Sequence, residues 1–363
     1  MESSSLSYGT SLPVPNVQEL AKDPAATVPP RYVRRDQEQT KMASAVDGIP
    51  VIDMEKLLLG DFKDSELEKL DSACRNWGFF QLINHGISPT LVEKFKWEIQ
   101  ELFKLPIEEK KKKYWQREGE MEGFGQAFVI SEDQKLDWGD MFFLTTLPPE
   151  MRKPHLFNQL PPSFRETMGN YAVEVQKLAL SILKLMATTL GMKGEEMTQL
   201  FEGGFQSMRT NYYPPCPQPE LVFGISPHSD AVGLTVLLQI NEIEGLEIRK
   251  DGRWIPVKPL ANAFIINVGD IMEIVSNGIY RSIEHRATVN RVHERLSIAA
   301  FYNPKLGAEI GPAPSLLSPQ NPPRFIPVTV DKYFKELFKR KLDGKGYIEC
   351  MRIDHVNGTE NAS

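Results

Sequence analysis

Ser207-Met208-Arg209-Thr210-Asn211-Tyr212-Tyr213, followed by Pro214-Pro215, begins a part of the chain in which short apolar runs alternate with turn residues. Runs of similar length follow at 234–239, 246–248, 254–257, 263–268, 282–286 and 296–301. Many short strands at near-regular spacing indicate a sandwich or a barrel. Because the helical patterns precede these strands, we predict a β core, of the double-sheet jelly-roll type, with α-helices packed outside it.

Patterns of helix dominate the part of the chain before these strands. Apolar stripes predict helices over 67–77, over 91–102 and within 164–192, with Gly78 and Gly191 as terminators of the first and the last. Residues 49–53 and 79–84 are typical of strands. We therefore expect an N-terminal arm over 1–48, a mainly helical region over 49–200, the jelly-roll core over 201–305 and a helical tail over 306–363, together forming a single catalytic unit.

The composition excludes several classes of protein. The 363 residues include 42 basic and 48 acidic ones, and a net charge of -6 does not suit nucleic-acid binding. Three cysteines without a CxxC pair argue against a disulfide framework and a cysteine-rich zinc site. No apolar run approaches the ~18 residues of a membrane span, and no secretory signal is visible. We expect a cytoplasmic monomer, and we interpret Lys110 to Lys113 as a solvated helix face.

His228-Ser229-Asp230 is the first candidate for chemistry. Residues i and i+2 of an extended chain point to the same face, so the imidazole and the carboxylate converge. His285, on another predicted strand, would complete a facial triad of two histidines and one carboxylate, which binds iron(II) and leaves open positions. Short motifs of this kind also occur by chance, and the same three residues are compatible with structural roles or a catalytic zinc site.

Arg295 and Ser297 share one face of a predicted strand, and a guanidinium beside a hydroxyl suits a carboxylate. The alternative is an exposed Arg295 paired with Glu294. 2-Oxoglutarate would chelate the iron with its 2-oxo acid end and present its distal carboxylate to Arg295. Asn211 and Tyr213 are also two residues apart in a predicted strand, so their side chains share a face. They either complete the hydrogen bonds of the cosubstrate or belong to the ordinary core.

The order and spacing of these segments resemble those of the plant 2-oxoglutarate/iron(II)-dependent dioxygenases over roughly residues 12 to 353. The segments are Asn211-Tyr212-Tyr213-Pro214-Pro215-Cys216-Pro217, His228-Ser229-Asp230, Asn267-Val268-Gly269-Asp270, Ser282-Ile283-Glu284-His285-Arg286, Glu294-Arg295-Leu296-Ser297 and, earlier, Trp77-Gly78-Phe79-Phe80-Gln81-Leu82-Ile83-Asn84-His85-Gly86. Glu122-Gly123-Phe124-Gly125-Gln126 and Arg340-Lys341-Leu342-Asp343-Gly344-Lys345 are similar to the senescence-related-gene-1-like clade, which includes alkaloid O-demethylases.

The resemblance implies a distorted jelly roll, or double-stranded β-helix, and assigns roles to site residues. His228, Asp230 and His285 would bind Fe(II), and residues 49–200 would form the N-terminal dioxygenase region. Arg295, Ser297 and Tyr213 would hold 2-oxoglutarate, with Asn211 assisting. Dioxygen would be the second cosubstrate and ascorbate the reductant.

The implied reaction is oxidation of a small molecule with release of succinate and carbon dioxide. Hydroxylation, O-demethylation and desaturation of an aromatic plant metabolite, such as an alkaloid or flavonoid, are all compatible with the clade. Phe301, Phe143, Met141 and Arg209 are the candidates for substrate contact, although plain core packing would explain the two phenylalanines equally well. An iron oxidase independent of 2-oxoglutarate and a non-catalytic small-molecule binding protein are the alternatives.

Overall fold

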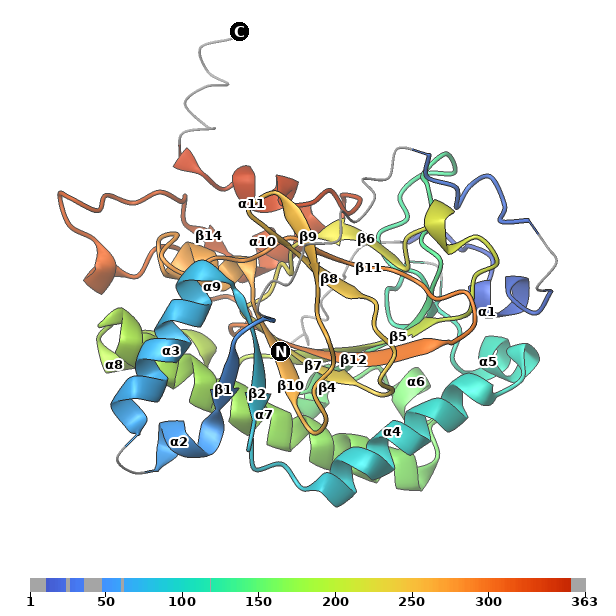
Figure 1. The fold of residues 1–363 in the computed structure, drawn as a ribbon, viewed down its shortest axis with the longest axis horizontal. Helices are drawn as coiled ribbons and strands as arrows, with labels where there is room; N and C mark the ends of the chain where they lie inside the picture. The colour runs from blue at the N-terminus through green and yellow to red at the C-terminus, as the bar shows by residue number, and fades with distance from the viewer. Residues whose placement is uncertain (1–10, 24–26, 36–47, 60–61, 118, 354–363) are drawn as a thin grey trace, which may run out of the picture.

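Two facing β-sheets form the centre of the molecule in the computed structural model, which describes residues 11–23, 27–35, 48–59, 62–117 and 119–353 (Figure 1). The strands are β1 (Val51–Asp53), β2 (Phe79–Ile83), β3 (Gly123–Gly125), β4 (Asp140–Leu147), β5 (Gln206–Tyr213), β6 (Ile225–His228), β7 (Leu234–Gln239), β8 (Leu246–Lys250), β9 (Arg253–Pro256), β10 (Phe264–Val268), β11 (His285–Ala287), β12 (Arg295–Tyr302), β13 (Glu309–Ile310) and β14 (Val328–Thr329). The large sheet has the order β1-β2-β10-β7-β12-β5-β4-β3 and the smaller one the order β6-β11-β8-β9. This architecture confirms the predicted jelly-roll core.

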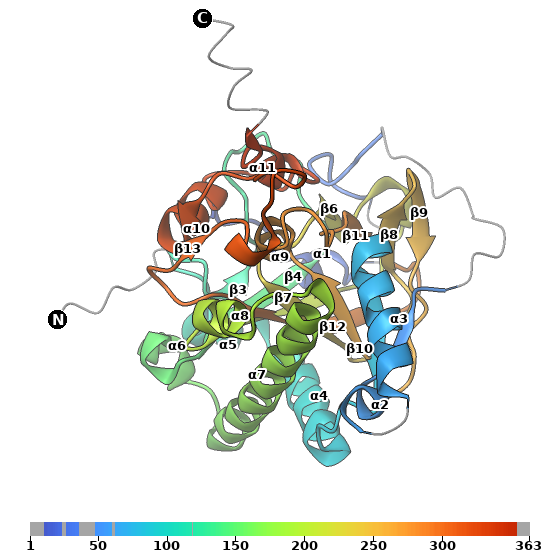
Figure 2. The same cartoon turned by 90° about the vertical axis from the view of Figure 1, so that its left-hand side faces the viewer.

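α-Helices flank the two sheets in the described part of the chain (Figure 1). They are α1 (Val17–Leu20), α2 (Met54–Leu58), α3 (Lys63–Asn76), α4 (Pro89–Lys104), α5 (Ile107–Lys113), α6 (Pro154–Phe157), α7 (Pro162–Leu190), α8 (Gly194–Phe201), α9 (Asp270–Val275), α10 (Val330–Leu337) and α11 (Gly346–Glu349). The long helix α7 packs against α3, α4 and strands β4, β7 and β12. In both views α4 and α7 lie on the opposite side of the molecule from α10, α11 and β6 (Figures 1 and 2).

Two apolar clusters account for the layers. The larger cluster fills the space between the helices and the large sheet, and Tyr171 of α7 and Phe264 of β10 belong to it. A smaller cluster lies between the two sheets, where Leu237 and Ala299 meet Ile248 and Ile255. The inner faces of the sheets are therefore partly apolar, and the polar site residues described below share these faces.

The predicted helix ends and strand positions agree well with the structure. Gly78 follows α3 with a φ of +62°, and a Cβ at this position would lie 2.2 Å from the carbonyl oxygen of Arg281. Gly191 ends α7 with a φ of +69°. Both glycines occupy the left-handed region, which other residues rarely adopt.

Three details differ from the sequence-based expectations. Strand β4 comes from the region that we predicted to be mainly helical, and it pairs with β5 inside the large sheet. The strand predicted over 282–286 begins only at His285. Lys110 is buried, with its Nζ 2.5 Å from the Gln18 side chain and from the carbonyl oxygen of Phe103, so it is not part of a solvated helix face. Lys111 to Lys113 are exposed, as predicted.

None of the helices in the described ranges is long and apolar enough to cross a lipid bilayer.

Candidate active site

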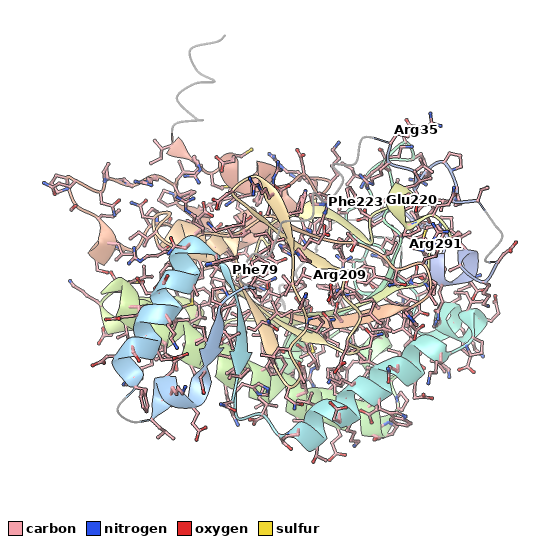
Figure 3. The ribbon with its side chains drawn as sticks, viewed as in Figure 1. Arg35, Phe79, Arg209, Glu220, Phe223 and Arg291 are labelled. Carbon is pink, nitrogen blue, oxygen red and sulfur yellow. The ribbon has the colours of Figure 1, made fainter. Side chains whose placement is uncertain are left out.

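Strand register gathers most of the candidate residues on the inner face of the large sheet. Partners across a ladder point to the same side, so each row of paired residues forms one line of side chains. Tyr213 is paired with Arg295. The other rows are Met141–Asn211–Ser297 and Phe143–Arg209–Ala299, across β4, β5 and β12. Arg209 lies among the strands at the centre of the molecule (Figure 3).

The smaller sheet contributes the metal-ligand candidates. His228 ends β6 and His285 begins β11, and the two residues are direct partners across that antiparallel pair. Asp230 follows two residues after His228, in the loop before β7. The Nε2 atoms of His228 and His285 lie 3.7 Å and 3.6 Å from Oδ1 of Asp230. Among the described residues these three form the one group of at least three His, Cys, Asp or Glu side chains whose donor atoms lie within 4.8 Å of one another.

Each of the three side chains has its other polar atom already bound. Nδ1 of His228 donates to the carbonyl of Ser226 at 2.8 Å, and Nδ1 of His285 lies 3.2 Å from the carbonyl of Ile283. These bonds leave Nε2 of each ring without a proton and directed to the site. A metal ion would therefore meet ligand atoms that are already oriented.

The carboxylate of Asp230 is held in the same way. Its Oδ2 accepts hydrogen bonds from Thr235 Oγ1 at 2.7 Å and Asn267 Nδ2 at 2.9 Å, so Oδ1 remains available. Burial alone would raise the pKa of Asp230, but the neighbouring histidines and these two hydrogen bonds lower it below its usual value.

Burial and the proximity of His285 lower the pKa of His228. The carboxylate is thus ionised and the His228 imidazole is neutral, which is the protonation state that metal ligands require. The residues present therefore fit a divalent metal with nitrogen and oxygen ligands, such as iron(II).

Arg295 is buried without an acidic partner among the described residues. It is 2% exposed, its guanidinium lies 5.4 Å from the centroid of the Tyr213 ring, and one Nη donates to Gln239 Oε1 at 3.1 Å. Its Nε has no hydrogen-bond partner in the described part of the chain. Burial lowers the pKa of Arg295. A buried guanidinium with free donors calls for an anion, and Glu294 is not that anion because its carboxylate accepts from Tyr212.

Two cavities meet at the triad. The inner cavity extends from the triad to Arg295. It is lined by Arg209, Asn211, Tyr213, Ile225, His228, Asp230, Thr235, Leu237, Leu246, Asn267, His285, Ala287, Arg295, Ser297, Ala299 and Phe301. The outer cavity shares Arg209, His228, Asp230 and Phe301 with the inner one, and Met141 and Phe143 also line it. The structure thus brings together all eleven residues that the sequence analysis selected.

Sequence reasoning missed much of the outer cavity. Its wall also includes Phe128, Phe205, Asn303, Phe334, Leu337, Phe338 and Leu342. Leu337 ends α10, and Phe338 and Leu342 follow it in the C-terminal tail. Leu342 belongs to the Arg340–Lys345 segment that resembles the clade, but that resemblance assigns it no role in the site. Gln239, Thr235 and Asn267, which hold Arg295 and Asp230, were also missed. Gln239 lies beside the site because β7 pairs with β12, and Thr235 lies beside Asn267 because β7 pairs with β10. Neither strand pairing can be read from the sequence.

Known proteins resemble this chain in sequence and in structure. The family described as the 2OG-Fe(II) oxygenase superfamily matches residues 204–304, and the one described as non-haem dioxygenase in morphine synthesis N-terminal matches residues 49–163. Protein SRG1 of Arabidopsis thaliana is 55% identical, over 97% of this chain and 100% of its own length. Oxoglutarate-dependent flavonoid 7-O-demethylase 1 of Ocimum basilicum is 54% identical, over 97% of this chain and 94% of its own. Codeine O-demethylase of Papaver somniferum is 50% identical, over 96% and 98%.

A solved structure supports the same relationship. The crystal structure of JOX2 in complex with 2OG, Fe and JA superimposes with a TM-score of 0.83 at 37% identity, covering 94% of this chain and 98% of that one. The matches extend over nearly the full length and include the predicted clade. The chain therefore belongs to the 2OG-Fe(II) oxygenase superfamily and is a 2-oxoglutarate- and iron(II)-dependent dioxygenase.

Proposed function

We propose that this dioxygenase removes an O-methyl group from, or hydroxylates, a small aromatic plant metabolite of the flavonoid or alkaloid type. His228, Asp230 and His285 hold the iron. The observation that carries the proposal is the junction of two cavities at these ligands, one ending at the buried Arg295 and the other lined by aromatic side chains. The first suits a dicarboxylic cosubstrate and the second a flat apolar substrate.

The inner cavity would hold 2-oxoglutarate between the metal and Arg295. Arg295 and Ser297 would bind the distal carboxylate, and the Tyr213 ring, whose centroid lies 5.4 Å from the guanidinium carbon, would support the guanidinium. Asn211 lies beside Ser297, with its Nδ2 3.4 Å from the Ser297 hydroxyl, and assists in orienting it. Bound iron(II) and 2-oxoglutarate supply the activation of dioxygen, with oxidative decarboxylation of the cosubstrate to succinate and carbon dioxide.

The outer cavity would place the substrate next to the metal. Phe143, Phe301 and Met141 form its apolar walls beside the triad. Nε of Arg209 donates to Asn211 Oδ1 at 2.7 Å, and Arg209 forms no ion pair with a described carboxylate. Its remaining donors can bind an oxygen of the substrate, so Arg209 would select molecules with an acceptor group near the reacting carbon.

The relatives favour aromatic ethers among the possible substrates. Two of the similar proteins are named as demethylases of a flavonoid and of codeine. In O-demethylation the methyl carbon is hydroxylated, and the resulting hemiacetal breaks its C–O bond. One O-methyl substrate, one dioxygen and one 2-oxoglutarate then give the phenol or alcohol, formaldehyde, succinate and carbon dioxide. Ascorbate would keep the iron reduced.

We further propose that the chain acts as a monomer in the cytoplasm. Every residue assigned to the site comes from one chain, so a second copy is not required to complete it. We keep the division into an arm (1–48), an N-terminal region (49–200), a jelly-roll core (201–305) and a tail (306–363). Matches of separate family descriptions to residues 49–163 and 204–304 support the two central regions.

Succinate and formaldehyde formation test the proposal. Purified protein with iron(II), ascorbate and 2-oxoglutarate is screened against methoxylated flavones and methoxylated alkaloids. We expect substrate-stimulated succinate with an equal amount of formaldehyde, both lost in His228→Ala, because this substitution removes one metal ligand. Succinate without formaldehyde identifies hydroxylation. Folded, iron-loaded protein that forms no succinate with either panel contradicts the proposed substrate class.

A further inference from the structure

The strand that carries His228 lies at an edge of the smaller sheet. In the described part of the chain β6 has β11 as its one strand neighbour. An edge strand leaves half of its backbone N–H and C=O groups without sheet partners. Gly344, from the segment between α10 and α11, covers this edge. Its N–H donates to the carbonyl of Pro227 at 3.0 Å, and its carbonyl accepts from the N–H of Ser229 at 3.1 Å. The two bonds bracket His228 on both sides.

Lys345, the next residue, connects the same segment to the other histidine. Its Nζ lies 2.6 Å from Glu273 Oε2 and 2.6 Å from the carbonyl oxygen of Ser282. Glu273 is 2% exposed, and its Oε2 also accepts from the N–H of Ser282 at 2.8 Å. Ser282 begins the irregular segment that leads into His285. The Lys345 ammonium group therefore connects the C-terminal tail to the segment that begins at Ser282 and leads to His285.

Two further features show that this junction is closely fitted. Gly344 has a φ of +50°, and a Cβ on it would lie 3.0 Å from Oε1 of Glu284, the residue before His285. Arg352, three residues after the end of α11, donates to Oε1 of Glu273 at 2.9 Å. Glu273 thus receives two cations from the tail, and each of its oxygens is occupied.

We propose that Lys345 is a positioning residue for the metal centre. It anchors the tail so that Gly344 pairs with β6, and it fixes Ser282 so that β11 begins at the correct position. The rings of His228 and His285 have centroids 4.2 Å apart, and a small displacement of either strand would misplace a ligand atom. Without this anchor we expect the triad to bind metal more weakly, although no ligand is lost.

The test measures metal affinity and requires no substrate. Apo protein is titrated with Co²⁺ by calorimetry, and the Co²⁺ absorption spectrum reports the coordination. We expect Lys345→Met to weaken Co²⁺ binding at least about tenfold, the lower end of the range for residues that support metal ligands. Lys345→Arg keeps the charge and should restore most of the affinity.

Lys339→Met is the matched control. Lys339 belongs to the same tail, and its Nζ lies 2.7 Å from Glu336 in a pair whose side chains are 57% and 44% exposed. This variant should bind Co²⁺ as the wild type does. Wild-type affinity in a Lys345→Met protein with an unchanged near-ultraviolet circular dichroism spectrum would overturn the proposal. Equal weakening in Lys339→Met would also overturn it.

A second variant covers the case in which Lys345→Met does not fold. Lys345→Gln removes the cation but keeps a polar side chain, and wild-type Co²⁺ affinity in that variant rejects the proposal. The inference rests on the metal site proposed above, and His228→Ala separates the two. If His228→Ala retains full Co²⁺ affinity, the site itself is wrong. If His228→Ala loses affinity and Lys345→Met does not, the positioning role alone is wrong.

Discussion

The ring of Phe128 stacks on the ring of Phe338, with centroids 5.5 Å and planes 20° apart. Phe128 lines the outer cavity of the active site and also two more open grooves at the surface. Its φ of +63° is unusual for a bulky residue, and such a conformation persists only where surrounding contacts impose it. The stacked pair thus forms a wall between the outer cavity and the surface grooves.

Removing this ring should widen the range of accepted substrates. We expect Phe128→Ala to raise kcat/KM for bulky methoxylated substrates relative to small ones, measured as succinate formation over a series of graded size. Phe128→Gly should give the same size profile but a higher Tm than Phe128→Ala, because glycine adopts positive φ without strain of about 1 kcal/mol or more. An identical size profile in wild type and both variants would show that Phe128 does not limit access.

Loss of the Arg295 guanidinium should weaken the binding of 2-oxoglutarate. A hydrogen bond to a charged group contributes about 1.5–3 kcal/mol, so Arg295→Gln should raise the KM for 2-oxoglutarate at least about tenfold. The measurement is succinate formation as a function of 2-oxoglutarate concentration. Arg291→Gln is the control, because Arg291 forms an exposed pair with Glu220 away from the site (Figure 3). An unchanged KM in Arg295→Gln would reject its role as carboxylate ligand.

Asn267 should raise the metal affinity of the site because it orients the carboxylate of Asp230. Its Nδ2 supplies one of the two hydrogen bonds that hold Oδ2 of the carboxylate. Asn267→Ala leaves Asp230 with Thr235 alone, and we expect Co²⁺ affinity to fall roughly tenfold in calorimetric titrations. Asn76→Ala removes an exposed side-chain contact with Ser72 on α3 and should change nothing. Equal affinities of the two variants would mean that Thr235 alone suffices to hold Asp230.

The sequence predicted the inner part of the site because strand periodicity is a local property. The spacing of Arg295 and Ser297, or of Asn211 and Tyr213, determines which side chains share a face once the segment is a strand. The pairing register then placed these two pairs opposite each other, which the sequence alone does not specify. The short motif around His228 indicates an iron and 2-oxoglutarate site only when it is considered together with Arg295.

The outer part of the site depends on the path of the chain rather than on local patterns. Phe338 and Leu342 reach the outer cavity because the tail returns across β6, where Gly344 covers the free edge of the strand. The burial of Lys110 has a similar cause. A run of four lysines is typical of an exposed helix face, and only the docking of the N-terminal arm, with Gln18, buries the first of them.

The buried Lys110 should give stability an unusual pH dependence. Burial lowers the pKa of Lys110 from its usual 10.5 to about 8. Between these two pH values the unfolded chain binds more protons at this position than the folded chain does, so the free energy of unfolding contributed by Lys110 rises as the pH increases from about 8 to about 10.5. The Lys110→Met variant lacks this pH-dependent contribution to the free energy of unfolding. We therefore expect wild type to gain stability relative to Lys110→Met over this window, measured by urea unfolding followed by tryptophan fluorescence. Lys111→Met, an exposed neighbour on α5, should follow wild type at every pH, and a constant difference between wild type and Lys110→Met would contradict a lowered pKa.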